Sequence, residues 1–306
     1  MNNLPDFSVL GSPLAIVLHD AGAANLIIGW LKSGLMPDVQ VHVGGPAEIL
    51  WRNNFPSIGT TSLMTALSGA TALLCGTGWA SKLEYNAMTD ARKLGIPIFA
   101  AIDHWVNYRQ RFLRDGVEIL PNEVWVSDHY ALLEAIRQLP EVNVREYENS
   151  YLKEQVRSVL ALTSISKGVL RTTRVLYALE PIRESWSCED PRPGEFQALD
   201  YFLSQLFLLG LDETCEIRLR PHPSDPSGKY DEWIVKTKMA NVSLAPHESI
   251  SEAIAWADIV AGCESFVLII GLKSGRKVVS TLPPWANKIR LPHKGIIRLN
   301  KLKPVQ

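Results

Sequence analysis

Cysteine is scarce in this chain: four occur, at Cys75, Cys188, Cys215 and Cys263, and no two of them have CxxC spacing. A zinc ribbon needs such close pairs, and a disulfide framework needs a regular set of cysteines, so neither is expected. Sparse, unpaired cysteine is typical of proteins that work in a reducing compartment. We therefore expect a cytoplasmic protein.

Long apolar runs are missing as well. The longest, Phe202 to Leu211, has the length of a buried helix and is too short to cross a bilayer. The residues Met1 to Asp6 lack the basic and apolar regions of a signal peptide. A formal net charge of −1 gives no strong overall field, so a nucleic-acid partner is not expected.

The pattern that is present is an alternation of short apolar strands and helices, as in Leu14 to His19 followed by Leu26 to Ser33. It predicts an α/β fold of two Rossmann-like domains whose parallel sheets face across a cleft. The chain has 306 residues, enough for two cores. Because residues 163–168 have the composition of a linker, we predict an N-terminal domain 1–165 and a C-terminal domain 166–306.

The most unusual loop of the C-terminal half is Arg220-Pro221-His222-Pro223, which follows a predicted strand. Prolines on both sides of His222 restrict its backbone, so the imidazole is expected on a stiff loop at the carboxyl end of the strand. In open α/β sheets this edge binds ligands. The alternative is a structural histidine that is bonded to the backbone.

A second strand ends in Gly262-Cys263-Glu264-Ser265, and a helical pattern follows. A glycine and polar residues at such a turn predict free backbone N–H groups and the positive end of a helix dipole, which suit a phosphate. We expect His222 and the Glu264-Ser265 turn to form two sides of one anion site. Glu264 could instead simply stabilise the start of its helix.

Three carboxylates at or near predicted strand ends of the N-terminal half are candidates for a general base. Asp103 is the first choice, because it directly follows a buried strand. Asp20 ends the first strand and precedes a turn with Gly22, which we interpret as a loop that lines the cleft. Glu84 lies in the next predicted helix. The structural alternatives are a helix cap for Asp20 and an ordinary surface carboxylate for Glu84.

Asp103 opens a polar and aromatic cluster that runs to Phe112. We predict that an acceptor is bound by His104, Asn107, Arg109 and Gly22. The alternative is a surface helix that three aromatic side chains, Trp105, Tyr108 and Phe112, anchor to the core.

The second half of the chain resembles the donor-binding domain of GT-B-type glycosyltransferases. The likeness is greatest to bacterial sialyltransferases and other CMP-sugar-dependent enzymes of capsule and lipopolysaccharide synthesis. It covers roughly residues 170–282 and is carried by Arg220-Pro221-His222-Pro223, by Gly262-Cys263-Glu264-Ser265 and, less specifically, by Glu180-Pro181. The family usually has two serines where this chain has Glu264-Ser265.

The resemblance implies a phosphate site in the C-terminal domain and a carboxylate base in the N-terminal one. The donor-binding residues that it implies are Glu180, Arg220, His222, Pro223, Gly262, Glu264 and Ser265. His222 and Ser265, with the helix N-terminus, would stabilise the leaving nucleotide. The chain has no DxD triplet, so neither a metal nor another cofactor is expected.

The function expected from these residues is a metal-independent glycosyltransferase that moves an acidic nonulosonic or Kdo-type sugar from a CMP donor to a surface glycan. In a retaining enzyme, one of the three carboxylates would instead be a nucleophile. Two further alternatives remain open. One is a sugar-nucleotide isomerase that resembles UDP-GlcNAc 2-epimerase, and the other is a sugar-nucleotide-binding protein without catalysis.

A basic segment lies near the C-terminus, with Lys288, Arg290, Lys294, Arg298, Lys301 and Lys303. Such a segment can hold a protein on anionic lipids, where a glycolipid acceptor would be found. Its alternative is a solvated terminal segment. We therefore expect a nucleotide-sugar donor and a glycan or glycolipid acceptor as partners, with peripheral association at the inner face of the membrane.

Overall fold

The structure, a computed structural model, describes residues 3–304 apart from 80, 164–171, 238–240 and 246. The chain forms two compact units, Met1–Tyr151 and Leu152–Gln306. Each contains a six-stranded sheet in which all neighbouring strands are parallel. The predicted fold, α/β with two Rossmann-like domains, is therefore confirmed. The units divide near the start of helix α6 (Ser150–Thr163), earlier than the predicted boundary, and residues 164–168 of the predicted linker lie outside the described residues.

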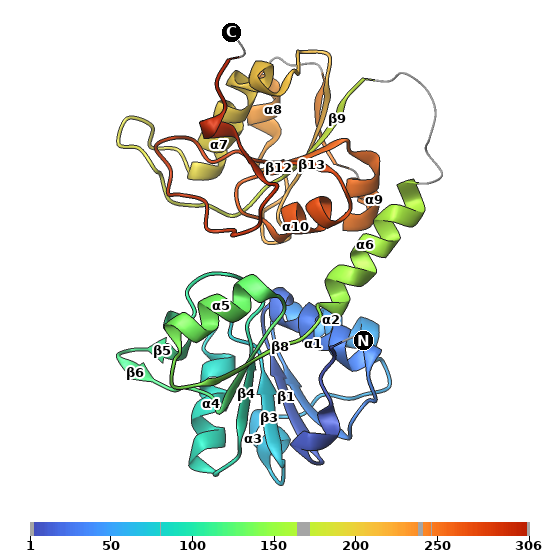
Figure 1. The fold of residues 1–306 in the computed structure, drawn as a ribbon, viewed down its shortest axis with the longest axis vertical. Coiled ribbons are helices and arrows are strands. Elements are labelled where there is room, and N and C mark those ends of the chain that lie inside the picture. The colour runs from blue at the N-terminus through green and yellow to red at the C-terminus, as the bar shows by residue number, and fades with distance from the viewer. Residues whose placement is uncertain (1–2, 80, 164–171, 238–240, 246, 305–306) are drawn as a thin grey trace. The chain divides into compact units, whose positions relative to one another are not determined.

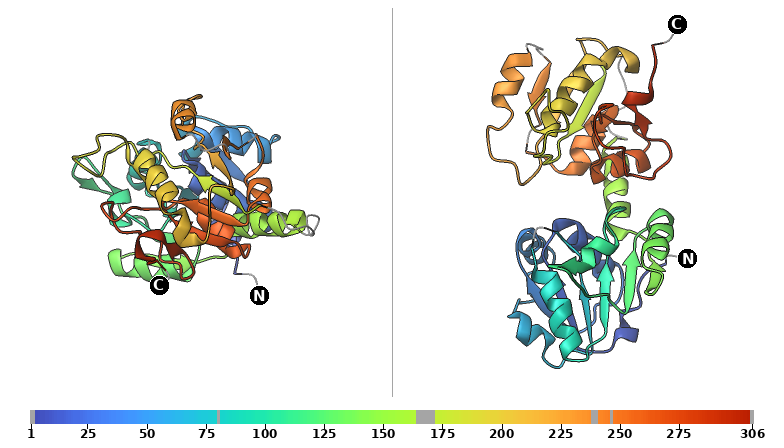
Figure 2. Two further views of the ribbon diagram at one scale, coloured as in Figure 1. Left: turned by 90° about the horizontal axis from the view of Figure 1, so that it is seen from above. Right: turned by 90° about the vertical axis from the view of Figure 1, so that its left-hand side faces the viewer.

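In the first unit, helices lie on both faces of a sheet with the strand order β2-β1-β3-β4-β7-β8 (Figures 1 and 2). Its strands are β1 (Leu14–Leu18), β2 (Val39–Val43), β3 (Ala72–Cys75), β4 (Ile98–Ala101), β7 (Glu123–Val126) and β8 (Asn143–Glu146). Before α6 its helices are α1 (Ala21–Ser33), α2 (Pro46–Asn54), α3 (Leu63–Leu67), α4 (Leu83–Lys93) and α5 (His129–Gln138), with 3-10 turns η1 (Phe7–Leu10) and η2 (Arg109–Phe112). A small hairpin, β5 (Leu113–Arg114) and β6 (Val117–Glu118), follows η2.

The second unit repeats this architecture with the strand order β11-β10-β9-β12-β13-β14. Its strands are β9 (Arg174–Ala178), β10 (Glu216–Arg220), β11 (Val242–Leu244), β12 (Ile259–Gly262), β13 (Lys277–Ser280) and β14 (Ile297–Arg298). Its helices after α6 are α7 (Gly194–Ser204), α8 (Asp231–Thr237), α9 (Ile250–Trp256) and α10 (Phe266–Lys273), with 3-10 turns η3 (Leu206–Leu209) and η4 (Leu299–Lys301).

Each sheet has a switch point, where connections leave in opposite directions. In the first sheet it lies between β1 and β3, because β2 is on the other side of β1. In the second sheet it lies between β9 and β12. Ligands of doubly wound sheets bind at the carboxyl ends of the strands at such points. The segments that follow β1, β3, β9 and β12 are therefore the first places to look for function.

Local sequence signals mark the end of α4 and the start of α9. Gly95, after α4, has the positive φ of +71° that a left-handed helix end needs. At α9 the Ser249 hydroxyl and the Glu252 carboxylate form a reciprocal cap, for which serine followed three residues later by glutamate is the sequence signal. The apolar run from Phe202 to Leu211, which has the length of a buried helix, is not one helix, since α7 ends at Ser204 and η3 follows.

The predicted loop around Gly22 is wrong. Helix α1 begins at Ala21, immediately after Asp20, so Gly22 lies in the first helical turn. A Cβ atom at this position would lie 1.8 Å from Asp103 Oδ2, and the glycine is therefore needed to make room for that carboxylate.

Among the residues that the structure describes, no helix is both long and apolar enough to span a bilayer.

Candidate functional site

The loop after β10 holds His222 on a fixed backbone. The residue is exposed, and its amide donates to Asp225 Oδ2 over 3.0 Å. The amide of Ser224 donates to His222 Nδ1 over 3.2 Å. Because Nδ1 accepts this bond, the neutral ring carries its proton on Nε2. The imidazole thus points outward as an N–H donor, and it is not a core histidine.

The charge state of His222 is set by its surroundings. Partial burial lowers the pKa of the imidazole; Asp225 opposes this, and the cations Arg183 and Lys229 add to it. A lowered pKa favours the neutral ring at neutral pH. His222 therefore offers one directed hydrogen bond rather than a full positive charge.

Asp225 fixes this loop from inside. Its side chain is fully buried and accepts hydrogen bonds from Arg183 (2.7 Å), Lys229 (2.9 Å) and the hydroxyl of Tyr230 (3.0 Å). A second buried carboxylate, Glu195 of α7, contacts the same two cations. Burial alone would raise the pKa of Asp225, but these bonds outweigh it and hold the pKa at about 2. The cluster joins the His222 loop to α7.

We expect Asp225→Asn to lower the free energy of unfolding at pH 7 by about 2 kcal/mol, the equivalent of its depressed pKa. A depressed carboxyl pKa gives stability that is present above the ordinary value of 3.8 and is lost as the pH falls through about 2. Denaturant unfolding measures the change. The control, Glu232→Gln, removes a carboxylate that is 80% exposed on α8 and should leave the midpoint unchanged. Equal midpoints for Asp225→Asn and wild type would contradict this role.

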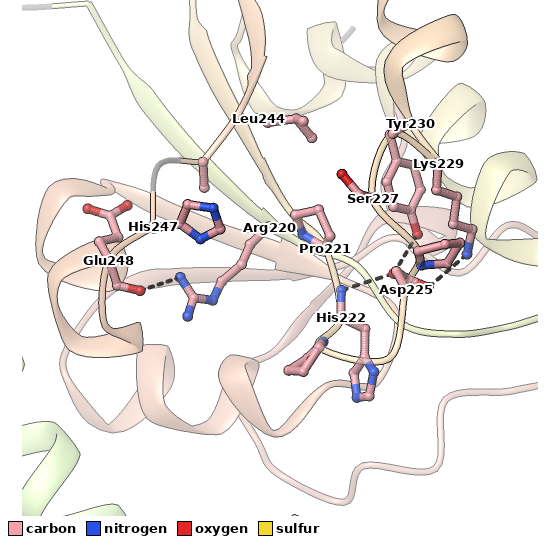
Figure 3. A pocket seen from close by; sticks show the side chains of 14 residues that line it. Arg220, Pro221, His222, Asp225, Ser227, Lys229, Tyr230, Leu244, His247 and Glu248 are labelled. Carbon is pink, nitrogen blue, oxygen red and sulfur yellow. Dashed lines mark hydrogen bonds and ion pairs between the residues drawn. The ribbon is translucent and has the colours of Figure 1, made fainter. Parts of the chain in front are cut away.

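A hollow of about 400 Å³ opens beside the His222 loop (Figure 3). Arg220 and His247 lie next to each other on one flank, and the loop from Pro221 to Tyr230 forms the other. The Arg220 guanidinium donates to the carbonyl of Glu248 over 3.0 Å, which uses one of its N–H groups. The hollow therefore places a guanidinium and imidazoles at the carboxyl end of β10, and these groups bind phosphates.

The turn after β12 has the predicted shape, but its backbone amides are already occupied. The amide of Glu264 donates to Glu180 Oε1 over 2.7 Å, and the amides of Cys263 and Ser265 bond to the same carboxylate. Burial raises the pKa of Glu180 to about 7, against the effect of the three amides. The expectation of free N–H groups that face a phosphate is therefore wrong, because a carboxylate from the end of β9 takes that place.

Other residues of this turn have structural tasks too. A Cβ atom on Gly262 would lie 2.7 Å from the Ala178 carbonyl oxygen, so only glycine fits there. The Ser265 hydroxyl accepts from the Val267 amide over 3.2 Å and caps α10, while its own proton is available to a ligand. Glu264, predicted to bind the donor, pairs instead with the Arg290 guanidinium over 2.7 Å.

In the first unit, the three predicted carboxylates are brought together near the switch point, and each stands against a glycine. Added Cβ atoms would lie 1.8 Å, 2.2 Å and 2.0 Å from carboxylate oxygens at the pairs Gly22–Asp103, Gly76–Glu84 and Gly78–Asp20. The charges of Asp20 and Asp103 also act on Glu84. The three candidates for a general base therefore lie together in the structure, and we call them the carboxylate cluster (Asp20, Glu84 and Asp103).

Glu84 is the inner member of this cluster. Its side chain is buried, and its two oxygens accept from the amides of His19 (3.0 Å) and Gly78 (2.6 Å). Burial raises the pKa of Glu84 to about 7; the two amides oppose this, and the charges of Asp20 and Asp103 add to it. Both readings from sequence are therefore corrected, because Glu84 is neither a surface carboxylate nor within reach of a substrate.

The buried carboxyls make the protein sensitive to pH. The pKa of Glu84 is raised from its ordinary value of 4.5. Its contribution to the free energy of unfolding is therefore fully present below pH 4.5 and is lost as the pH rises through about 7. We expect wild type to lose about 3 kcal/mol more stability than Glu84→Gln between pH 4.5 and 8, by unfolding in denaturant. The exposed-site variant Glu48→Gln should follow wild type. Parallel curves for Glu84→Gln and wild type would refute this.

Asp20 and Asp103 are the outer members of the cluster. Asp20 contacts His19 Nδ1 over 2.8 Å and accepts from the Trp79 amide over 3.1 Å, so it ties β1 to the segment after β3 and does not cap α1. Asp103 accepts from the buried Arg111 over 3.2 Å and keeps 24% of its side chain exposed above Gly22. Asp103 is thus oriented by a guanidinium and still open to a ligand.

The predicted acceptor residues have different surroundings. Arg109 is paired with Glu118 (2.8 Å) and Glu141 (2.7 Å), so two carboxylates already offset its charge, which argues against its predicted role in binding the acceptor. Asn107 is exposed with a φ of +58°, and His104 packs against the Trp105 ring. The three aromatic side chains are buried as the alternative expected, but the segment forms the 3-10 turn η2 and not a surface helix.

Two residues that hold the candidate sites together, His19 and Asp225, were not identified as site residues from the sequence. His19 bonds Asp20, and the His19-Asp20 pair at a strand end was a visible signal. Asp225 lies three residues after His222 in the same polar loop, and nothing in the local sequence marks it as the residue that four donors surround. Within the described part of the chain, no three His, Cys, Asp or Glu side chains are placed to hold a metal ion.

No protein-family model matches the sequence, and no curated protein matches it either. Solved structures do match its fold. The UDP-GlcNAc 2-epimerase of Methanocaldococcus jannaschii is similar with a TM-score of 0.56 and 10% identity, over 87% of this chain and 83% of that one. The Neisseria meningitidis enzyme of the same name, bound to UDP-GlcNAc, gives 0.53 and 12% over 87% and 81%.

A structure described as the glycotransferase of kitacinnamycin gives a TM-score of 0.52 and 13% identity, over 93% of this chain and 85% of that one. Identities this low show the architecture alone. The two Rossmann-like units of this chain have the GT-B architecture that glycosyltransferases and UDP-GlcNAc 2-epimerases share.

Proposed function

We propose that the protein is a sugar-nucleotide enzyme that transfers a sugar to an acceptor hydroxyl. In this scheme the C-terminal unit binds the nucleotide of the donor, and the N-terminal unit supplies the general base. The observation that carries the proposal is the His222 loop, an outward imidazole N–H that a buried ion cluster holds beside a hollow lined by Arg220 and His247. Such a fixed donor suits a phosphate that gains charge as it leaves.

The proposed reaction breaks the bond between the anomeric carbon and the phosphate oxygen, whose electron pair leaves with the nucleotide. The N–H of His222 Nε2 donates to that phosphate, and Arg220 balances its charge. The acceptor oxygen bonds to the anomeric carbon and loses its proton to Asp103. Arg111 orients Asp103 for this step, since their contact is 3.2 Å long.

Glu84 and Asp20 are positioning residues in this scheme. Glu84 binds the amides that follow β1 and β3, and Asp20 fixes the His19 ring and the Trp79 amide. They hold the segments after β1 and β3 in place, and Gly22 in the first of these lies against the Asp103 carboxylate. Among the predicted acceptor residues, Asn107, His104 and the bare surface of Gly22 remain in the proposal, whereas Arg109 does not.

A CMP sugar, with an acidic nonulosonic or Kdo-type group, remains the proposed donor. The amides after β12 are bonded to Glu180, which leaves a small set of phosphate donors around His222 and Arg220. A set of this size suits one phosphate better than two. The Ser265 hydroxyl is a further donor on the neighbouring turn.

A thermal-shift screen over CMP, CDP, UDP and GDP tests the proposal. We expect CMP to raise the melting temperature most, because bound ligand stabilises only the folded protein. Stabilisation by UDP or a UDP-sugar without any by cytidine nucleotides would reject the CMP donor. No stabilisation by any of the four nucleotides would reject the nucleotide site itself.

The second candidate function is a sugar-nucleotide isomerase similar to UDP-GlcNAc 2-epimerase. The two matched epimerase structures support it as well as the glycosyltransferase structure supports transfer. The outer members of the carboxylate cluster, Asp20 and Asp103, together with His19 also offer several proton-transfer groups near one switch point. Turnover of UDP-GlcNAc by the purified protein without any acceptor would favour this candidate over the transferase.

The acceptor in the proposal is a surface glycan or glycolipid, reached by peripheral contact with anionic lipids. Arg290 of the basic C-terminal segment is paired with Glu264, so the lysines of that segment would make this contact. Sedimentation with phosphatidylglycerol vesicles, compared with phosphatidylcholine vesicles, tests it. Equal amounts in both pellets would remove the membrane from the proposal.

A further inference from the structure

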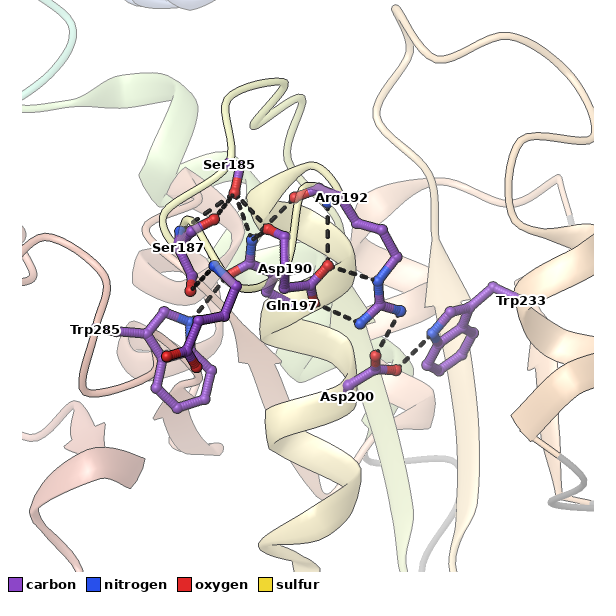
Figure 4. Close-up of polar contacts among 9 residues, drawn as sticks. Ser185, Ser187, Asp190, Arg192, Gln197, Asp200, Trp233 and Trp285 are labelled. Carbon is purple, nitrogen blue, oxygen red and sulfur yellow. Dashed lines mark hydrogen bonds and ion pairs between the residues drawn. The ribbon is translucent and has the colours of Figure 1, made fainter.

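A second hollow of about 520 Å³ lies in the C-terminal unit (Figure 4). It is formed by the loop between β9 and α7, by the second half of α7 and by the loop after β13. Its lining includes Asp190, Arg192, Asp200, Tyr201, Ser204 and Trp285. The hollow beside His222 is lined by other residues, so the two are separate sites of the same unit.

Trp285 is a large aromatic side chain that is held rigidly although 52% of it is exposed. Its indole N–H donates to Gln197 Oε1 over 2.8 Å, and the Tyr201 ring packs against it at 5.6 Å in an edge-on arrangement. Gln197 is itself 2% exposed and donates to the carbonyls of Asp190 (3.0 Å) and Arg192 (2.9 Å). A buried amide thus sets the orientation of an exposed ring.

The polar side chains of the hollow are also held in place by bonds within the protein. The Arg192 guanidinium contacts Asp190 over 2.6 Å and Asp200 over 2.7 Å, and Asp200 accepts from the Trp233 indole over 2.8 Å. About half of Arg192 and 43% of the Asp200 side chain remain exposed. The hollow therefore presents both donors and acceptors beside an aromatic surface. Arg192 pairs with Asp190 and Asp200, and Glu189 adds a third carboxylate to the lining.

We propose that this hollow binds a neutral saccharide. The C–H surface of a pyranose packs on an indole ring, and its hydroxyls need donors and acceptors at the rim. Arg192 uses three of its five N–H groups on Asp190 and Asp200, and each Asp200 oxygen has one partner, so both residues keep bonding capacity for a ligand. Burying an exposed aromatic surface of this kind contributes binding free energy without the cost of ordering it. The inference rests on the proposed function in taking a sugar as ligand, and it assigns a glycan contact outside the nucleotide site.

The test is saturation-transfer NMR on the full-length protein without nucleotide, using cellobiose, maltose and N,N′-diacetylchitobiose, with choline as a cationic comparison. We expect at least one disaccharide to bind saturably. Trp285→Ala should weaken this binding at least about tenfold, equivalent to about 1.4 kcal/mol. Ser204→Lys, which fills the hollow from a helix surface and leaves Trp285 in place, should do the same.

Two controls separate this site from the rest of the protein. Phe207→Ala removes another exposed aromatic ring of the unit, 59% exposed, and should leave binding unchanged. His222→Ala should also bind the disaccharide normally, so a failed nucleotide site and a failed saccharide site give different results. Binding that persists in both Trp285→Ala and Ser204→Lys, binding of choline alone, or no binding of any disaccharide would overturn the proposal.

Discussion

Replacing Asp103 with asparagine is expected to reduce the transfer rate by roughly 10²- to 10⁴-fold, the usual contribution of a general base. The amide keeps the size of the carboxylate and can still accept from Arg111, which lies 3.2 Å away, but it cannot take the acceptor proton. In the proposal, nucleotide binding belongs to the other unit. The thermal shift with nucleotide should therefore stay at the wild-type value while kcat falls.

The matched control is Asp115→Asn, which removes a carboxylate that is 77% exposed in the hairpin after η2. Asp115 has a φ of +50°, a conformation that asparagine tolerates well, so its backbone should not change. This variant should transfer sugar at the wild-type rate. A wild-type rate for Asp103→Asn as well would exclude Asp103 as the base, and the assignment would then pass to Asp20.

The second large effect is expected for His222→Ala, which should abolish most of the thermal protection by CMP and lower turnover by roughly 10²- to 10³-fold. The variant removes one directed donor, Nε2–H, while the loop stays tied to the Asp225 ion cluster. The fold should therefore remain intact. Thermal shift and initial rates, measured on the same preparation, report the two effects separately.

His129→Ala serves as the control for this variant, because His129 is 70% exposed and belongs to the first unit. It should be protected by CMP as wild type is. If His222→Ala were protected equally well and kept the wild-type turnover, the phosphate would have to bind elsewhere, and Arg220 with His247 would be the next pair to test. Loss of turnover with full protection would instead place His222 in the chemical step alone.

Much of the fold follows from local pattern. Continuous apolar runs such as Leu14–Leu18 and Val124–Val126 are typical of buried strands, and the helices between them favour parallel neighbours. Elements without such a signal were missed. Strand β8 is an edge strand that alternates exposed and half-buried residues, and its sequence Asn-Val-Arg-Glu carries little apolar surface.

The positions of the candidate site residues could be predicted from the sequence, but the bonding partners of their groups could not, for a physical reason. A carboxylate directly after a strand, like Asp103, lies at the sheet edge whatever the rest of the chain does. The fate of a hydrogen-bonding group depends on residues far away in sequence. The amide of Glu264, for example, is bonded to Glu180, 84 positions earlier in the chain.

The sequence by itself therefore determined the architecture, the two strand-end positions His222 and Asp103, and the cap signals, because these depend on neighbours within a few residues. Only the tertiary structure decided which of those groups are free to act. It committed Arg109, Glu264 and the amides after β12 to partners within the protein, and it buried Glu84 beneath the glycines of its cluster. Hydrogen bonds and ion pairs between distant segments form only when the sheets assemble, so no local pattern records them.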